Sequence, residues 1–372
     1  MTRERRAKLA TDALFAVHGL AMGSWAARIA DVQRSLQLDE RTLGFALLGL
    51  AGGSVLVLPL SGGLCARRGP RPVGTAGWLA ISMGLFAIGH TNSAWQLFAA
   101  LAVFGAGLSA LDVAMNAHGA VVERRLERSV MIGFHARWSI GGITAAALAT
   151  GAIAAHWSPA LHLTVIAVLG TVVVGFVGRE ALDHETPEGS PLMAWPSRAL
   201  LGLAAVGVFA GFGEGAATDW SAVFLHSVLH AAAAATALGY MLFAAGMAIA
   251  RLVGDRAVDR SSAASVIRVR ALLAAGGFAI VAAAPVTAVA LVGYAAVGLG
   301  VAVLIPLVFS VAERSPGVVP GQGIAGVATI SYAAFFAGPP IIGFTAHATS
   351  LRWSMGLIAL LLVCASLIPI RD

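Results

Sequence analysis

Charged residues are scarce in this sequence. Asp, Glu, Lys and Arg make up 11% of its 372 residues, whereas a soluble protein carries about 25%. Apolar residues make up 58%, and the mean hydropathy is +0.85. The shortage of charge excludes an ordinary cytosolic enzyme, a disordered chain and a nucleic-acid-binding domain. The charges that are present separate long apolar stretches, so the sequence predicts a polytopic membrane protein.

Cysteine is almost absent, and the common catalytic motifs are missing. Cys65 and Cys364 lie far apart and form neither a CxxC pair nor a metal-ligand spacing. We expect both to fill apolar surroundings. The sequence contains no Walker A loop, HExxH or GxSxG. We therefore expect no enzymatic activity, no cofactor and no metal, and no ATP-driven transport by this chain alone.

Apolar runs of spanning length recur along the whole chain. The N-terminal segment MTRERRAK is basic, as in a signal peptide, but the apolar run behind it continues past Trp25, which indicates an uncleaved first helix. Pro285 divides a continuous apolar stretch and predicts a tight turn between two spans. Twelve spans are predicted, at residues 9–30, 41–66, 72–90, 94–120, 130–155, 160–179, 198–225, 233–256, 266–283, 286–312, 321–347 and 351–370.

Basic residues gather in alternate connections between these spans. If the N-terminus is cytoplasmic, each cytoplasmic connection contains Arg or Lys, whereas the opposite side holds only Arg28, Arg34, Arg41 and Arg352. This bias predicts that both termini are cytoplasmic. It also explains the net charge of +6 and the pI of about 10.3 without nucleic acid as a partner.

The chain divides near its middle. Residues 181–197 hold several acids and prolines and predict a cytoplasmic linker between two six-helix bundles, residues 1–180 and 198–372. Weak internal similarity agrees with two related halves. The pair Glu123-Arg124 recurs as Glu313-Arg314, and the spacing from Ser139 to Gly151 recurs from Ser331 to Gly343.

The connection between spans two and three resembles the signature of the major facilitator superfamily, Gly-x-x-x-Asp-Arg-x-Gly-Arg. Gly62, Arg67, Gly69 and Arg71 match it, but Ala66 replaces the Asp. In that family the Asp helps to latch the two halves in the outward-facing state, so the latch is in question here. After span eight, Asp259-Arg260 keeps the Asp-Arg pair without the glycines. The resemblance covers the full length and implies an all-α fold of twelve transmembrane helices in two pseudo-symmetric bundles.

Further segments resemble a bacterial branch of that family related to the fucose permease. They are SWAAR from Ser24, LDVAMN from Leu111, FHARWS from Phe134 and GEGAATDWS from Gly213. The fucose permease also has an acid in its fourth span, which Asp112 could match. It has a second acid within span one, and this chain does not, because Asp12 lies near the cytoplasmic end. The two-acid proton scheme therefore does not carry over.

Polar residues at membrane depth are costly and mark candidate sites. Asp112, Glu214 and His135 are candidates for proton coupling, and each could instead make a structural hydrogen bond. Gly211, Gly213 and Gly215 predict a broken or kinked helix around Glu214. The candidates for substrate binding are Trp25, Asn116, Trp138, Ser139, Tyr332 and Phe336; packing or a place in the interfacial aromatic belt is the alternative for the aromatic ones.

The remaining candidates lie at span ends and connections. Arg28 could pair with Asp31 or bind an anionic substrate, and the pair is the favoured interpretation. Asp219 is a candidate gate residue or interface anchor. The other loop candidates are Arg67, Arg71, Asp259 and Arg260.

We expect a secondary transporter of a small polar solute, sugar-like or another small metabolite, that is coupled to protons and works as a monomer in the bacterial cytoplasmic membrane. The alternative is a proton-driven exporter of the same fold. Such antiporters carry a glycine-proline motif in span five, whereas Gly338-Pro339-Pro340 lies in span eleven here. A membrane sensor or embedded enzyme is disfavoured, because the loops are too short for an output domain and no catalytic cluster is present.

Overall fold

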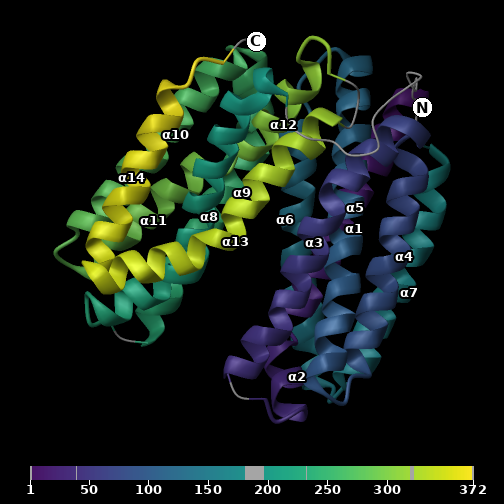
Figure 1. Ribbon diagram of the computed structural model, residues 1–372, viewed down its shortest axis with the longest axis horizontal. Helices are drawn as coiled ribbons and strands as arrows, with labels where there is room; N and C mark the ends of the chain where they lie inside the picture. Colours follow the sequence, from purple (N-terminus) through teal and green to yellow (C-terminus); the bar gives the residue numbers. More distant parts are fainter. Residues whose placement is uncertain (1, 39, 181–196, 232, 319–321, 371–372) are drawn as a thin grey trace. The chain divides into compact units, whose positions relative to one another are not determined.

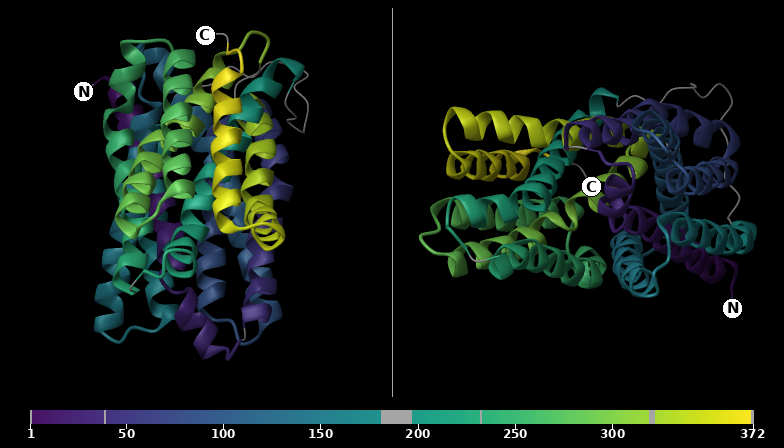
Figure 2. Two further views of the ribbon diagram at one scale, coloured as in Figure 1. Left: turned by 90° about the vertical axis from the view of Figure 1, so that its left-hand side faces the viewer. Right: turned by 90° about the horizontal axis from the view of Figure 1, so that it is seen from below.

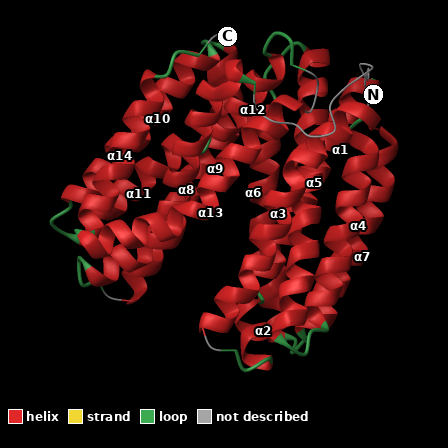
Figure 3. Cartoon of the chain, in the orientation of Figure 1, coloured by secondary structure: helices red, strands yellow, loops and turns green. Residues whose placement is uncertain are grey.

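The computed structural model describes residues 2–38, 40–180, 197–231, 233–318 and 322–370. Over these residues the chain forms helices and no strand (Figure 3). The predicted linker, residues 181–197, lies outside the described residues except for Ser197. The α-helices are α1 (Arg3–Ala26), α2 (Ile29–Ser35), α3 (Glu40–Arg68), α4 (Pro70–Gly89), α5 (Ala94–Leu126), α6 (Met131–Ala154), α7 (Pro159–Val177), α8 (Leu201–Ser227), α9 (Ala233–Asp259), α10 (Ala263–Ala283), α11 (Thr287–Val301), α12 (Leu304–Arg314), α13 (Gln322–Ala348) and α14 (Leu351–Leu367).

Over the described residues these helices make twelve segments, as many as the predicted spans, when α11 and α12 are counted together and the short α2 is left out. Within the described ranges, seven segments are long and apolar enough to cross a membrane by length and composition alone, and two shorter stretches, Leu238–Gly254 and Leu351–Leu367, are also apolar. The predicted turn at Pro285 is confirmed, because α10 ends at Ala283 and α11 begins at Thr287. The chain is thus an all-α, multi-pass membrane protein.

The chain forms two compact units, which are described separately. The first comprises residues 1–130, 134–195 and 317–325, and the second comprises residues 131–133, 196–316 and 326–372. In the first unit α5 packs against α1, α3 and α4, and α7 packs against α1 and α4. In the second unit α10 packs against α11 and α14, and α8 packs against α9, α11, α12 and α14. Long helices run alongside one another within each unit (Figures 1 and 2).

The first span differs from its predicted bounds at both ends. The helix begins at Arg3, because the Thr2 hydroxyl accepts a hydrogen bond from the Arg5 amide and caps it. It ends at Ala26 rather than at residue 30, and α2 follows as a separate short helix. No glycine or proline marks this end, so the hydrophobic pattern gave no stop signal there.

The prediction of a broken helix around Glu214 is wrong. The helix α8 runs unbroken from Leu201 to Ser227. Gly213 instead makes room for packing, since a Cβ there would lie 3.2 Å from the Val301 side chain and 3.4 Å from that of Leu362. A glycine lowers helix propensity but keeps its N–H, so tertiary packing can maintain the helix. The break falls in the tenth span, between α11 and α12.

Candidate functional site

A hydrogen-bonded chain of three polar side chains joins α5 and α6. The Asn116 Nδ2 atom donates to the Asp112 carboxylate at 3.2 Å, and the Asn116 Oδ1 atom lies 3.2 Å from His135 Nε2. Because the amide oxygen can only accept, His135 Nε2 is the donor in this contact. Asp112 is 7% exposed, Asn116 is fully buried and His135 is 9% exposed. The structure therefore brings together Asp112, Asn116 and His135 as one buried acid–amide–imidazole chain.

Local helix geometry and aromatic packing position this chain. Asp112 and Asn116 are four residues apart in α5, so both side chains lie on one helix face. The Phe15 ring of α1 packs edge-on against the His135 ring, with centroids 5.0 Å apart, and stacks on Phe134 at 5.5 Å. These rings cover the imidazole with apolar surface, where an uncompensated polar group would be costly.

A second buried histidine, His18, ties three helices together. Its Nδ1 atom accepts a hydrogen bond from Trp138 Nε1 of α6 at 2.8 Å, and its Nε2 atom lies 3.1 Å from the Leu108 carbonyl oxygen of α5. The indole N–H can only donate, so Nδ1 of His18 carries no proton and Nε2 donates to the carbonyl. Both ring nitrogens are thus held by groups that do not titrate, which indicates a structural role.

Gly19 allows this contact between α1 and α6. A Cβ at Gly19 would overlap the Trp138 carbonyl oxygen, so any larger residue would push the two helices apart. Trp25, a predicted stacking surface for a ligand, is only 1% exposed and therefore lies within the packed interior. The half-buried Ser139 donates to the His135 carbonyl within α6.

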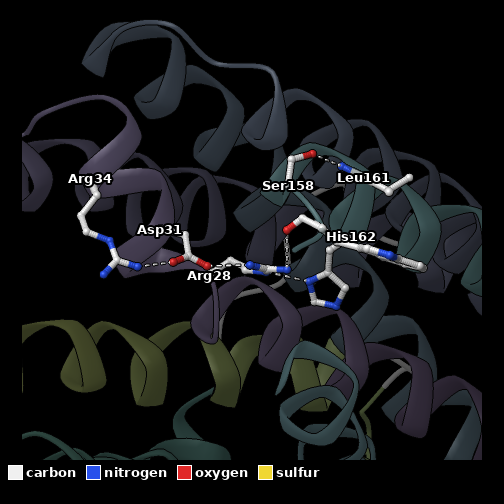
Figure 4. Close-up of polar contacts among 7 residues, drawn as sticks. Arg28, Asp31, Arg34, Ser158, Leu161 and His162 are labelled. Carbon is white, nitrogen blue, oxygen red and sulfur yellow. Dashed lines mark hydrogen bonds and ion pairs between the residues drawn. The ribbon is translucent and has the colours of Figure 1, made fainter. Parts of the chain in front are cut away.

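Arg28 pairs with Asp31, as the favoured interpretation predicted. Its Nη1 atom lies 2.6 Å from the Asp31 carboxylate, its Nη2 atom donates to the Trp157 carbonyl at 3.1 Å, and its Nε atom donates to His162 Nδ1 at 3.2 Å (Figure 4). Arg34 contacts the other Asp31 oxygen. The guanidinium is 2% exposed and joins the end of α1 to the start of α7, so it acts as a structural clamp.

The clamp changes the acidity of Asp31, which lies outside the membrane-spanning segments. The hydrogen bond from Arg28 has the largest effect and lowers the pKa of the Asp31 carboxyl below its ordinary value of 3.8; burial opposes it, and the hydrogen bond from Arg34 adds to the lowering. Asp31 is therefore charged at physiological pH, and the buried Arg28 is paired.

In the second unit the candidate acids are more accessible. Glu214 is half-buried and Asp219 is exposed, both on α8. Each interacts electrostatically with the Tyr240 hydroxyl of α9. On the same helix, Trp220 Nε1 and Ser221 Oγ are buried and have no hydrogen-bond partner in the part of the chain that the structure describes. Tyr332 and Phe336 belong to α13, but their side chains lie outside the described residues.

The loop candidates lie at helix ends. Arg67 and Arg71 flank the junction of α3 and α4, and both are exposed. Gly69 has a φ of 81°, which favours glycine, and it caps α4. Ala66, where the family has its Asp, is fully buried. Asp259 and Arg260 are exposed at the end of α9.

Sequence reasoning missed two of these arrangements. His18 was given no role, although it lies within the first apolar run, seven residues before Trp25 on the same helix face. The contact of Arg28 with His162 and with the Trp157 carbonyl depends on residues more than a hundred positions away, so no local pattern indicates it. Among the described residues, no group of three or more His, Cys, Asp or Glu side chains could hold a metal ion.

Comparisons with known proteins agree with this architecture. The family model of the Major Facilitator Superfamily matches residues 13–321. An uncharacterised MFS-type transporter of Yersinia pestis is 32% identical over 96% of this chain and 93% of its own length. An uncharacterised transporter of Sinorhizobium fredii is 32% identical over 91% of this chain and 90% of its own, and the membrane protein MosC of Rhizobium meliloti is 28% identical over 95% and 87%.

Solved structures share the fold. The fucose:proton symporter of Escherichia coli superimposes with a TM-score of 0.78 over 97% of both chains, at 14% identity. The proton:xylose symporter XylE gives a TM-score of 0.77 over 99% of this chain and 96% of its own, at 10% identity. The chain belongs to the Major Facilitator Superfamily. It is a secondary transporter with a small-molecule substrate, not an enzyme.

Proposed function

We propose that the chain moves a small polar solute across the bacterial cytoplasmic membrane by alternating access, together with protons. The observation that supports this is the buried chain from Asp112 through Asn116 to His135. It holds an acid and a base at membrane depth, joined by an amide that does not titrate. Ionisable residues in such positions are functional candidates, and proton relays are one of their established uses.

The hydrogen-bonded side chains of Asp112, Asn116 and His135 also offer a way to couple protonation to the contact between α5 and α6. A carboxylate is a stronger hydrogen-bond acceptor than a carboxylic acid. Protonation of Asp112 therefore weakens the bond that its carboxylate accepts from Asn116, while the bond from the same amide to the Asp112 carbonyl, at 2.9 Å, remains. A proton taken up on α5 thus changes the hydrogen bonding of the amide that contacts His135 on α6.

The names of structural relatives support the same class of substrate. Two proteins that share the fold are proton symporters, one of fucose and one of xylose. We extend the coupling ion and the small polar substrate to this chain as part of the proposal. The same proposal places the protein in the cytoplasmic membrane as a monomer with both termini in the cytoplasm. It also divides the chain into two bundles at a linker, residues 181–197. Glu214, Asp219 and Tyr240 supply a polar surface in the second unit for the solute.

The substrate is sought first by thermal shift on the purified protein. The panel holds sugars and polyols, small carboxylates, nucleosides, vitamins and lipophilic cations. A ligand at a hundred times its Kd adds about 2.7 kcal/mol of stability. Stabilisation by a small nutrient supports the proposal. Stabilisation only by lipophilic cations contradicts it and favours the exporter.

The stabilising ligand is then used in proteoliposomes. We expect Asp112→Asn and His135→Gln to lower pH-driven accumulation about tenfold or more, because a hydrogen bond to a charged group is worth about 1.5–3 kcal/mol. Counterflow exchange, which needs no net proton movement, should persist in Asp112→Asn. The matched controls are Glu127→Gln and His226→Gln, since both side chains are exposed. Full accumulation with unchanged pH dependence in both test variants would exclude the proton role.

A further inference from the structure

The tenth span is broken in its middle. The helix α11 ends at Val301, Ala302 and Val303 form a turn, and α12 begins at Leu304. All four of these residues are buried. A helix normally satisfies each carbonyl with the N–H four residues later. At membrane depth no water replaces a missing partner, so a break requires another donor from the protein.

Pro306 explains which carbonyl loses its helical partner. The N–H that would bond to the Ala302 carbonyl belongs to residue 306, and proline has none. The Ala302 carbonyl oxygen instead accepts a hydrogen bond from Arg251 Nε of α9, at 3.1 Å. Arg251 is 4% exposed, so its guanidinium is held within the packed second unit. The donor from α9 therefore replaces the bond that Pro306 removes.

A second arginine contacts the same helix end. Arg270 of α10 donates from Nη1 to the Leu299 carbonyl at 3.0 Å. The C-terminal end of a helix carries a partial negative charge, which cations stabilise. Two guanidinium groups from two neighbouring helices thus hold the last turn of α11. Only the Arg251 contact falls on the carbonyl that Pro306 leaves without a helical donor.

When the two halves are aligned on their internal repeat, this break corresponds to the position of the proton-coupling candidates in the first half. Ala302 and Pro306 precede Glu313 by eleven and seven residues, and Asp112 and Asn116 precede Glu123 by the same distances. In α5 the helix is continuous, and the Asn116 side chain donates to the Asp112 carbonyl at 2.9 Å. The corresponding carbonyl of each half therefore accepts a hydrogen bond from a side chain, Asn116 in one half and Arg251 in the other.

We propose that Arg251 and Pro306 together form a hinge in the tenth span. Pro306 keeps α11 and α12 as separate helices, and Arg251 satisfies the carbonyl that this separation exposes. The two helices change their mutual angle about residues 302–303 while the carbonyl stays bonded to α9. The use of this hinge in alternating access rests on the proposed function, but the hinge itself does not.

A double-mutant cycle in purified protein tests the role of Arg251. Arg251→Met should lower the melting temperature by about 2–4 °C, since it leaves a buried carbonyl without a partner. In the Pro306→Ala background the same change should have a smaller effect, because residue 306 then supplies the N–H for the Ala302 carbonyl. Arg270→Met is the matched control: residue 303 has an N–H in both backgrounds, so its effect should be equal in the two. If the Arg251→Met protein can be expressed and purified only when it also carries Pro306→Ala, that rescue supports the same conclusion.

Spin labels test the motion. Cysteines replace Val292 on α11 and Ser315 at the end of α12, after both native cysteines are changed to serine. A straight helix would place the labels roughly 35 Å apart, at about 1.5 Å per residue. We expect a broad distance distribution with Pro306 and a single narrow one with Pro306→Ala.

Two results would overturn the hinge. One is an equal loss of stability from Arg251→Met in both backgrounds, which would mean that Arg251 does not act through the Ala302 carbonyl. The other is a narrow distance distribution that Pro306→Ala leaves unchanged. Neither measurement uses a transported solute. A failure to find proton-driven transport would therefore count against the proposed function alone.

Discussion

Hydrogen-bond partners, rather than residue type, distinguish the two buried histidines His18 and His135. His18 and His135 are both buried in apolar helices. The ring of His18 lies between an indole N–H and a backbone carbonyl, and neither partner can change its charge. His135 contacts an amide whose other end bonds to an acid. Under the proposed function, protonation of Asp112 therefore alters the hydrogen bonding of the amide that contacts His135, whereas the contacts of His18 stay fixed.

The Arg28 clamp leads to a prediction about pH. The pKa of Asp31 is lowered in the folded protein, so its contribution to stability is present above the ordinary value of 3.8 and is lost as pH falls through the lower folded value. We expect Asp31→Asn to lower stability at pH 7 by about 1 kcal/mol, as for a partly exposed ion pair. This difference should shrink below pH 3.8. Melting curves of both proteins from pH 7 to pH 3 measure it, and a constant difference over that range would contradict the assignment.

The sequence predicted the members of the site better than their roles. Asp112 and Asn116 were expected on one helix face from their spacing, and α5 confirms this. Their link to His135 depends on how α5 and α6 pack, which the sequence pattern does not contain. Trp25 was a candidate for stacking on a ligand, with a place in the interfacial aromatic belt as the alternative, and the packing around α1 buries it. A polar residue in an apolar run indicates a buried contact, and its partner comes from the tertiary structure.

At the scale of helices, apolar length predicted the spans well and their interruptions poorly. The run at residues 286–312 is continuous in hydrophobicity, although the helix breaks at residues 302–303. The glycines around Glu214 predicted a break that α8 does not have. Proline removes an N–H and so needs a donor from another helix, whereas glycine keeps its N–H and only weakens the helix. Proline alone does not mark a break either, because α3 continues through Pro59 and α13 runs unbroken from Gln322 to Ala348 across Pro339-Pro340.

The contact between α1 and α6 gives a prediction at this scale. Gly19→Ala places a methyl group against the Trp138 carbonyl and must separate the helices. Overpacking of this kind costs about 1–3 kcal/mol, so we expect a lower melting temperature. The control is Gly151→Ala in α6, where a Cβ would meet nothing within 4 Å. That change should leave stability equal or slightly higher. Equal effects of the two substitutions would contradict the close approach.

For the whole molecule, composition and loop charge carried most of the information. The low charge predicted a multi-pass membrane protein, and the family comparison and the helices confirm it. The agreement has a physical basis, because a bilayer admits only structures that satisfy their backbone groups internally. A chain of this hydropathy with helical periodicity thus has few other folds available. The orientation in the membrane depends on the basic residues alone and remains a prediction.

Cysteine labelling in intact cells tests that orientation. In a background without the native cysteines, Asn92→Cys lies in the connection between α4 and α5, and Ser261→Cys lies between α9 and α10; both positions are exposed. The basic residues of the neighbouring connections predict Asn92 outside and Ser261 inside. A maleimide that cannot cross the membrane should therefore label Asn92→Cys alone, and both variants should react once the cells are permeabilised. Labelling of Ser261→Cys alone would show that the orientation is the reverse of the predicted one. Under the proposed function, protons would then reach Asp112, Asn116 and His135 from the opposite end of the first unit.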